Sequence, residues 1–379
     1  MRGYELLDRM ELISPRFIEE AEKTPKAKAV YVRWVSLAAC LCIITAGAFL
    51  LQKHFAKAPE PDIPIGERLP DENFDLNAGT MGFEGYLLYD ISEFTNGNPW
   101  SEYTLSGTLP IYRNNAYDNT RAGIPKGMTE DEMQERLEQI VSAASLTVIK
   151  SEFVYDDSAK SLGHTAATKL VAECDKATVE IFADGRVIYK PHSGGKFMPL
   201  EHYIGVYGEL LGFKTPVAVK YGDYFYNGEF YERHVVYDAG STAEEGILGY
   251  SLRYASFRSN ENGELYFISM FDGLSVCEKT GDVRVINADE AKQRLINGDY
   301  VTSASYAFTG EKYIGKVELI YRSGPFEEML LPYYRFYVQI PQDSDEAAKL
   351  GLKCYGAYYV SAIADEDLGK LPLYDGHFN

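Results

Sequence analysis

The chain has 379 residues, is 46% hydrophobic and carries a formal net charge of −19. This length and apolar content are sufficient for more than one folded domain. The negative charge lies after residue 33 and disfavours contact with a phosphate backbone, so we expect no nucleic-acid partner. The 30 tyrosines and 33 glycines favour strands and tight turns over a helical bundle.

Residues 1–33 predict a short amphipathic segment. Six apolar side chains recur at helical spacing and form one stripe, which so short a segment cannot bury by itself. Two interpretations stay open: the stripe lies on a lipid surface, or it docks onto a cytoplasmic partner protein. The candidate partner-binding residues are Leu6, Leu7, Met10, Ile13, Phe17 and Ile18.

Residues 34–52 predict a transmembrane helix, because the 18 residues from Trp34 to Leu51 hold no charge. The string Leu37–Cys40 is similar to a lipoprotein processing site. However, the apolar run follows Cys40, whereas a signal peptide needs its apolar region before the cleavage point. We therefore expect the helix to be retained and the lipid bilayer to be a partner.

The basic residues around this helix predict its orientation. Lys23, Lys26, Lys28 and Arg33 precede the helix, and fewer basic residues follow it closely. By the positive-inside rule we expect a single-pass protein of the cell membrane, with a cytoplasmic N-terminus and an extracytoplasmic C-terminal region.

After the helix we expect an extended linker at residues 53–78 and two modules, at residues 79–262 and 263–379. In the first module Thr129 and Glu132 form a capping-box pattern for a helix, and Asp184-Gly185 predicts a hairpin turn. A second helix is expected after Pro199, followed by strands at 232–239, 249–259 and 263–271.

The second module shows a similar order. Turns are expected at Asp272-Gly273 and Gly281-Asp282, and a helix capped by Asn287 runs to Gly298. Strands follow at 315–323, 331–340 and 354–363. The expected fold class is α+β, with two related modules of antiparallel sheet packed with helices.

Two stretches carry family resemblances. Residues 4–23, "YELLDRMELISPRFIEEAEK", with "RWVSLAACL" after a basic linker, resemble the N-terminus of membrane-anchored anti-sigma-factor-like proteins of Gram-positive bacteria. Residues 266–364, with "INADEAKQRLINGDY", "VELIYRS" and "LPYYRFYVQI", resemble PepSY-like, YycI-type outer domains that regulate signalling. These resemblances imply a regulatory protein with an extracytoplasmic sensing region. The alternative is a surface-anchored binding or structural module without a signalling role.

The strand within 331–340 offers a candidate ligand face. Alternate residues of a strand point to opposite sides, so Tyr334, Phe336 and Val338 are expected to pack in the core. The residues between them then face the side where a ligand or partner is expected: Tyr333, Arg335 and Tyr337.

No catalytic or metal-binding pattern is convincing. Ser193–Lys196 and Lys279–Gly281 resemble parts of penicillin-recognising serine enzymes, but the glycines oppose the helix that this chemistry needs. We therefore expect a non-enzyme without metal or cofactor. Cys174, Cys277 and Cys354 permit at most one disulfide, and the sequence leaves its formation open.

Overall fold

A computed structural model describes residues 88–371, apart from residues 92–93, 95–96, 103–104, 106, 121, 220–222, 227, 305, 343 and 370. The chain divides into two compact units, Met1–Asp62 and Ile63–Asn379, and the described residues belong to the second. The predictions for the cytoplasmic segment and the linker lie outside the described residues. Within residues 88–371, no helix has the length and apolar character needed to cross a membrane. The expected transmembrane helix at residues 34–52 also lies outside this range.

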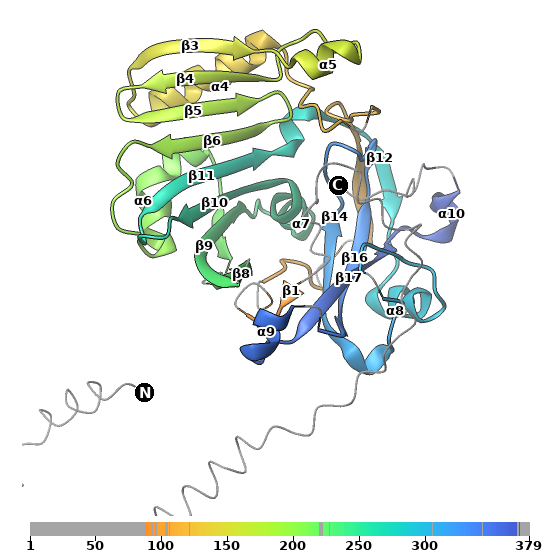
Figure 1. Cartoon of the computed structure of the whole chain (residues 1–379). Helices are drawn as coiled ribbons and strands as arrows, with labels where there is room; N and C mark the ends of the chain where they lie inside the picture. The colour runs from red at the N-terminus through yellow and green to blue at the C-terminus, as the bar shows by residue number, and fades with distance from the viewer. Residues whose placement is uncertain are drawn as a thin grey trace, which may run out of the picture. The chain divides into compact units, whose positions relative to one another are not determined.

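The larger of two main sheets has nine strands, and all its described pairs are antiparallel (Figure 1). In spatial order the strands are β3 (Val148–Val154), β4 (Lys169–Cys174), β5 (Ala177–Phe182), β6 (Arg186–Pro191), β11 (Leu265–Asp272), β10 (Arg253–Ser259), β9 (Glu229–Asp238) and β7 (Pro216–Val219), with β8 (Asp223–Tyr226) also paired to β9.

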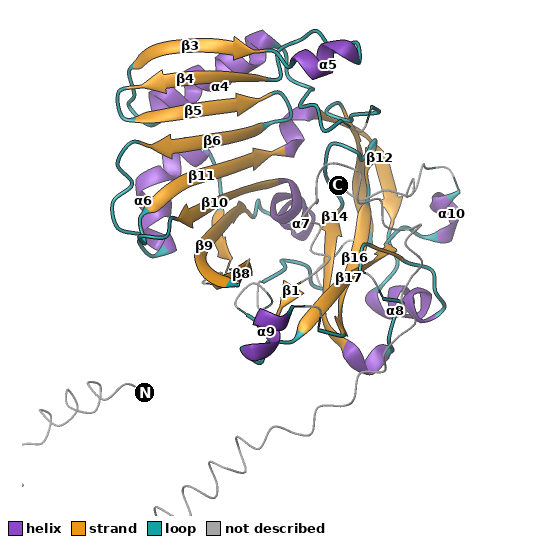
Figure 2. Cartoon of the chain, viewed as in Figure 1, coloured by secondary structure: helices purple, strands orange, loops and turns teal. Residues whose placement is uncertain are grey.

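Helices cover one face of this sheet. α4 (Glu130–Ala143) and α6 (Leu200–Leu211) both lie behind it in the view of Figure 2. Their apolar side chains bury one core with alternate residues of the strands, including Leu170, Val179 and Phe257. This one-sided packing follows from the period of two along each strand, which sends the other residues to the opposite face. A short helix, α5 (Asp157–Ser161), follows β3.

The second sheet has five strands and is buried on both faces. Its order is β1 (Leu88–Tyr89), β17 (Cys354–Ser361), β16 (Pro332–Ile340) and β14 (Ile314–Tyr321), with β13 (Val301–Thr302) also paired to β17. A three-stranded sheet consists of β12 (Cys277–Arg284), β2 (Thr108–Asn114) and β15 (Met329–Leu330). The remaining elements are the helices α8 (Ala288–Ile296), α9 (Asp345–Lys349) and α10 (Asp365–Leu368) and the 3₁₀ turns η2 (Gly273–Val276) and η3 (Glu311–Tyr313).

One helix joins the two main sheets. α7 (Ala243–Leu252) lies between β9 and β10 in the chain and packs against β14 of the five-stranded sheet. Its Thr242 cap accepts a hydrogen bond from the backbone N–H of Glu245. Gly249 permits the close contact with β9, because a Cβ atom there would overlap the carbonyl oxygen of Asp238.

Several local predictions are confirmed. Thr129 and Glu132 form the predicted capping box of α4, and Asn287 and Glu290 form that of α8. The hairpin of β5 and β6 turns at Asp184-Gly185, and α6 begins directly after Pro199.

The expected α+β fold class is wrong. Strand accounts for about 40% of the described structure and helix for about 25%, so this part of the chain is mainly β-sheet. The two main sheets also differ in strand number and order. Across the expected module boundary at residues 262 and 263, β10 and β11 pair within the same sheet.

Of three further local predictions, one holds in part, one is confirmed and one is wrong. The expected strand at 249–259 begins as the last turn of α7, because Thr242 caps a helix there. The turn expected at Asp272-Gly273 is present as the 3₁₀ turn η2, which connects β11 to β12. The turn expected at Gly281-Asp282 is absent: both residues lie inside β12, where a register shift between Lys279 and Gly281 leaves Thr280 as the extra residue.

Candidate binding surfaces

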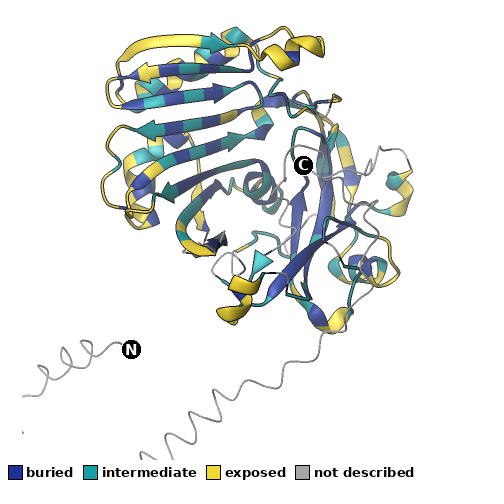
Figure 3. Ribbon diagram, viewed as in Figure 1, coloured by how far each residue is buried: buried dark blue, intermediate teal, exposed yellow. Residues whose placement is uncertain are grey.

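The predicted ligand-face residues of β16 lie in the interior. Tyr333 and Tyr337 are 4% exposed, and they pack in a core with Tyr355 and Tyr359 of β17. Tyr334, Phe336 and Val338 belong to a different core on the opposite face of the sheet. The predicted alternation is therefore present, but both of its sides face protein. Figure 3 shows β16 and its neighbours as buried over most of their length.

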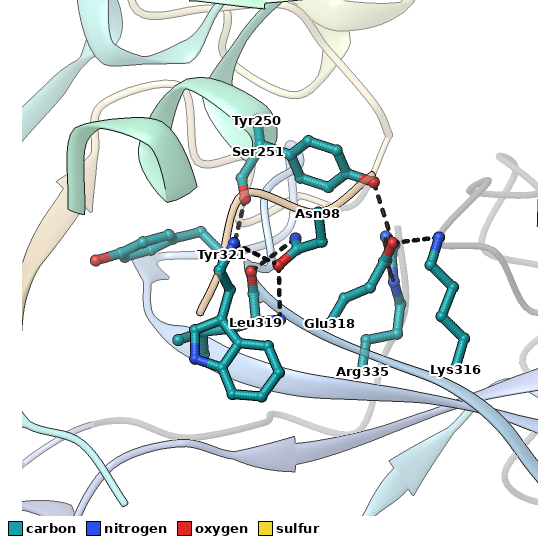
Figure 4. A network of polar contacts seen from close by, with 9 residues as sticks. Asn98, Tyr250, Ser251, Lys316, Glu318, Leu319, Tyr321 and Arg335 are labelled. Carbon is teal, nitrogen blue, oxygen red and sulfur yellow. Dashed lines mark hydrogen bonds and ion pairs between the residues drawn. The ribbon is translucent and has the colours of Figure 1, made fainter. Parts of the chain in front are cut away.

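Arg335 takes part in an ion network around the fully buried carboxylate of Glu318 (Figure 4). The Arg335 guanidinium donates to Glu318 Oε2 over 2.5 and 3.1 Å. Lys316 Nζ lies 2.7 Å from Oε1, and the Tyr250 hydroxyl of α7 donates to the same oxygen over 3.1 Å. Two cations, Arg335 and Lys316, and one phenol, Tyr250, thus contact the same carboxylate.

This network stays ionised despite its burial. Burial alone would raise the pKa of Glu318, but the charges of Arg335 and Lys316 outweigh it, so the pKa is lowered. Burial lowers the pKa of Lys316, and Glu318 opposes that shift. The group carries two positive charges against one negative charge. A buried group of this kind is costly to break, because removing one partner leaves the others unpaired.

Beside this network, side chains satisfy the outer edge of β14. Asn98 pairs with the backbone of Leu319 as a neighbouring strand would: its Nδ2 donates to the carbonyl oxygen over 3.1 Å, and its Oδ1 accepts from the N–H over 3.4 Å. Ser251 Oγ of α7 accepts from the backbone N–H of Tyr321 over 3.0 Å (Figure 4). The exposed edge of a sheet is thereby closed by α7 and the loop before β2.

A second ion pair lies on the same side of this sheet. Arg322 is 1% exposed and donates to Glu327 over 2.6 Å. Its guanidinium also lies 5.5 Å from the ring centre of Tyr333 and 5.7 Å from that of Tyr359. These cation–π contacts add to the apolar packing of the two tyrosines in the interior.

The nine-stranded sheet offers a different surface, which we call the open face: the side of its strands that points away from α4 and α6. Leu170, Ala172 and Cys174 of β4 lie in the core beneath the helices, so Lys169, Val171 and Glu173 point to the open face. The strand register extends this assignment across the sheet. The charged residues of the open face are Lys150, Lys169, Arg186, Lys190, Arg233 and Arg258, with Glu152, Glu173, Glu180 and Glu229. Asp184 of the β5–β6 turn pairs with Arg186 over 2.7 Å.

Ion pairs organise the centre of the open face. Glu180 accepts from Lys169 over 2.8 Å and also from Lys190 of the neighbouring strand. Burial would raise the pKa of Glu180, but the two lysines outweigh it and the pKa is lowered. Next to them, the Phe182 ring lies between two cations: its centre is 5.3 Å from Lys169 Nζ and 4.5 Å from the Arg186 guanidinium. The Phe182 ring therefore makes cation–π contacts with both Lys169 and Arg186.

The open face becomes more aromatic towards β9. The Arg258 guanidinium lies 5.2 Å from the ring centre of Phe267. Burial raises the pKa of Tyr254, and the positive charges of Arg233 and Arg258 oppose the shift. At the β9 end, the ring of Tyr237 contacts that of Tyr250 in α7, with 5.5 Å between centres. This contact connects the open face to the Glu318 network.

A pocket of about 230 Å³ lies between α4 and the β5–β6 turn, and its polar lining includes Glu132, Glu135, Arg136 and Asp272. Glu132 already accepts from the backbone N–H of Thr129 in the capping box. Arg136 donates to Gln139 over 3.1 Å. The helix thus satisfies much of the pocket's polar lining by itself.

The other sequence candidates are dispersed. Ser193–Lys196 forms a loop, and a Cβ atom at Gly194 would overlap the carbonyl oxygen of Leu265, so this loop packs directly against β11. Lys279–Gly281 lies in β12. Cys174, Cys277 and Cys354 are free thiols. Residues Leu6 to Ile18, with the predicted partner-binding stripe, lie outside the described residues.

Sequence reasoning missed the open face and the partners of Arg335. For the open face a signal exists in the alternation of "KLVAEC", "ATVEIF" and "RVIYKP", where charged residues occupy every second position. For the ion network the signal is weaker: Lys316 and Glu318 are two apart in an otherwise apolar strand. Tyr250 lies 68 residues from Glu318, and no local pattern connects them.

Comparison with known proteins leaves the chain without an assigned family: no family model matches it, and neither does any curated protein. The resemblances to anti-sigma-factor-like and PepSY-like proteins therefore stay predictions.

Proposed function

We propose that the chain is a regulatory protein in which residues 88–371 form the binding module and the open face is its binding surface. The observation that carries this proposal is the position of the basic side chains. The chain has a net charge of −19, yet the strands of the open face present six basic residues against four acidic ones, and a fifth acid, Asp184 of the β5–β6 turn, pairs with Arg186. A local charge opposite to that of the whole chain favours a specific partner over a merely solvated surface.

The junction at α7 supports a regulatory role. Tyr237 on the open face contacts Tyr250, and Tyr250 donates to Glu318 in the other sheet. A partner that prefers one arrangement of β9 and β10 would therefore also bias the contact between α7 and β14. This chain of contacts is a physical connection between the open face and the second sheet.

The N-terminal stripe is proposed as a second binding surface, for a sigma factor or another signalling protein. The support is the amphipathic pattern of the sequence and its resemblance to anti-sigma-factor-like proteins. Such a stripe suits helix-in-groove recognition, in which apolar side chains fill a complementary groove.

Affinity capture from the host cell, with the full-length chain as bait, tests both surfaces. The open-face variant combines Lys169→Gln, Arg186→Gln and Lys190→Gln. The control variant combines Lys279→Gln, Arg284→Gln and Lys292→Gln, which removes the same residue types from ion pairs elsewhere on the molecule. A stripe variant carries Leu7→Asp and Phe17→Asp.

We expect a sigma factor or signalling protein to be retained by the wild type and lost with the stripe variant. A second partner should be lost with the open-face variant and retained by the control variant. If wild type and stripe variant retain the same proteins, the chain is a binding or structural module without a signalling role. If the open-face variant retains everything, the open face is not the binding surface.

A further inference from the structure

We infer that the open face binds an acidic polypeptide segment of mixed sequence. This inference rests on the proposed function, because it names the kind of partner that the same surface accepts. It uses three properties of the open face: its charge, the arrangement of that charge, and the side chains between the charges.

The first property is the sign of the charge. Lys169, Arg186 and Lys190 are 29%, 45% and 43% exposed, so a partner can reach all three. Lys169 lies on β4, and Arg186 and Lys190 both lie on β6, so β5 separates Lys169 from the other two by about 10 Å. Carboxylates spaced along an extended peptide can reach these cations. Arg186 Nε already pairs with Asp184 over 2.7 Å, and the remaining donors of its guanidinium suit a partner's carboxylate.

The second property is that acidic residues are interleaved with the basic ones. Lys150 lies opposite Glu173 in the strand register, and Glu180 lies between Lys169 and Lys190. A uniform polyanion with a charge on every unit would place some of its charges against Glu173 and Glu180, where they repel. A polypeptide of mixed sequence can place acidic residues only where the face is basic.

The third property is apolar surface between the charges. Val171 and Ile188 are half-buried on the open face and flank Glu180 in the strand register. Phe182 is also half-buried, beneath Lys169 and Arg186. These side chains gain contact only with a partner that carries apolar groups of its own. Together, the three properties favour a mixed acidic polypeptide over a polyphosphate chain.

Selection from a phage-displayed library of random 12-residue peptides tests this inference on the full-length chain. We expect the selected peptides to combine Asp or Glu with apolar residues. A synthetic peptide from the selection should bind the wild type and the control variant with the same Kd. The open-face variant should bind it about tenfold more weakly, because three favourable charges of modest individual weight are lost. Added salt should weaken the binding to wild type.

Three results would overturn the inference: selection of neutral or basic peptides, no enrichment, or equal Kd for the wild type and the open-face variant. Displacement of the peptide by inorganic polyphosphate at equal charge concentration would assign the face to uniform polyanions instead. If host-cell capture still depends on the open face in these cases, the proposed function stands and only the acidic polypeptide is excluded. Circular dichroism of each variant shows whether a loss of binding reflects a loss of fold.

Discussion

The hydroxyl of Tyr250 donates a hydrogen bond over 3.1 Å to the carboxylate of Glu318, although 68 residues separate the two in the chain. Tyr250 belongs to the helix between two strands of the nine-stranded sheet, and Glu318 belongs to the edge strand of the five-stranded sheet. Because Glu318 is fully buried, its charge depends on this donor as well as on Arg335 and Lys316. The bond therefore links the stability of one sheet to the position of a helix from the other.

Substitution of Tyr250 by Phe should lower the free energy of unfolding by about 1.5–3 kcal/mol, since a hydrogen bond to a buried charged group is lost. Urea denaturation measures the effect. Tyr155→Phe is the matched control, because its hydroxyl donates to the exposed carboxylate of Glu130 over 2.9 Å. The control should change stability by no more than about 0.5 kcal/mol. Equal losses of unfolding free energy at the two sites would show that the buried hydrogen bond contributes no more to stability than the exposed one.

Two helical glycines should respond to alanine with opposite signs. In α7, a Cβ atom at Gly249 would overlap the carbonyl oxygen of Asp238, so Gly249→Ala must displace the helix from β9. We expect a loss of about 1–3 kcal/mol, as for other overpacked sites. In α6, nothing lies within 4 Å of such an atom at Gly205, and Gly205→Ala should stabilise the protein by about 0.5–1 kcal/mol.

Thermal unfolding of both variants gives the two signs directly. If Gly249→Ala leaves the unfolding free energy unchanged, α7 can accept a Cβ atom at this position without a loss of packing against β9. If the open-face peptide binds Gly249→Ala and wild type equally, the position of α7 does not affect the binding surface.

The elements that sequence predicted correctly are those whose signals are local. The capping boxes of α4 and α8 and the turn at Asp184-Gly185 each depend on residues within a few positions of one another. α7 was missed although Thr242 and Glu245 show the capping spacing, because Gly246 and Gly249 weaken a helical pattern and its apolar residues surround the helix.

The site was less predictable than the elements. Alternation in β16 correctly separated Tyr333 and Tyr337 from Tyr334, but it cannot tell whether a second layer covers each face. That information comes from Tyr250 and from the loop before β2, which reach this sheet only through tertiary contacts. The expected division into two modules failed for a similar reason, since strands from both sides of the boundary at residues 262 and 263 join one nine-stranded sheet.

Asp118 should make stability depend on acid pH. Burial alone would raise its pKa, but hydrogen bonds from Thr120, Ile124 and Lys126 lower it from 3.8 to about 2. Because the folded-state pKa is the lower one, this carboxylate contributes stability above pH 4 and loses it as the pH falls towards 2. The shift corresponds to about 2 kcal/mol.

The difference in unfolding free energy between wild type and Asp118→Asn isolates this group from the other acids of the chain. We expect the wild type to be more stable at pH 5 and the difference to shrink by about 2 kcal/mol by pH 2. Urea titrations at several pH values measure it. A difference that stays constant with pH would show that the Asp118 carboxylate has a similar pKa in the folded and unfolded states.

Glu180→Gln should strengthen the binding of an acidic peptide to the open face. Glu180 neutralises Lys169 and Lys190, so the amide leaves both lysines with their full charge and more freedom to pair with a partner's carboxylates. Each exposed ion pair is worth up to about 1 kcal/mol, which corresponds to a Kd about fivefold lower at low salt. The gain should disappear as salt rises, because screening acts on exposed charges. Lys292 pairs with Glu311 elsewhere on the molecule, so Glu311→Gln is the control and should leave the Kd unchanged. Weaker binding by Glu180→Gln would mean that the partner bonds to this carboxylate, and a basic or neutral segment would then fit the face better than an acidic one.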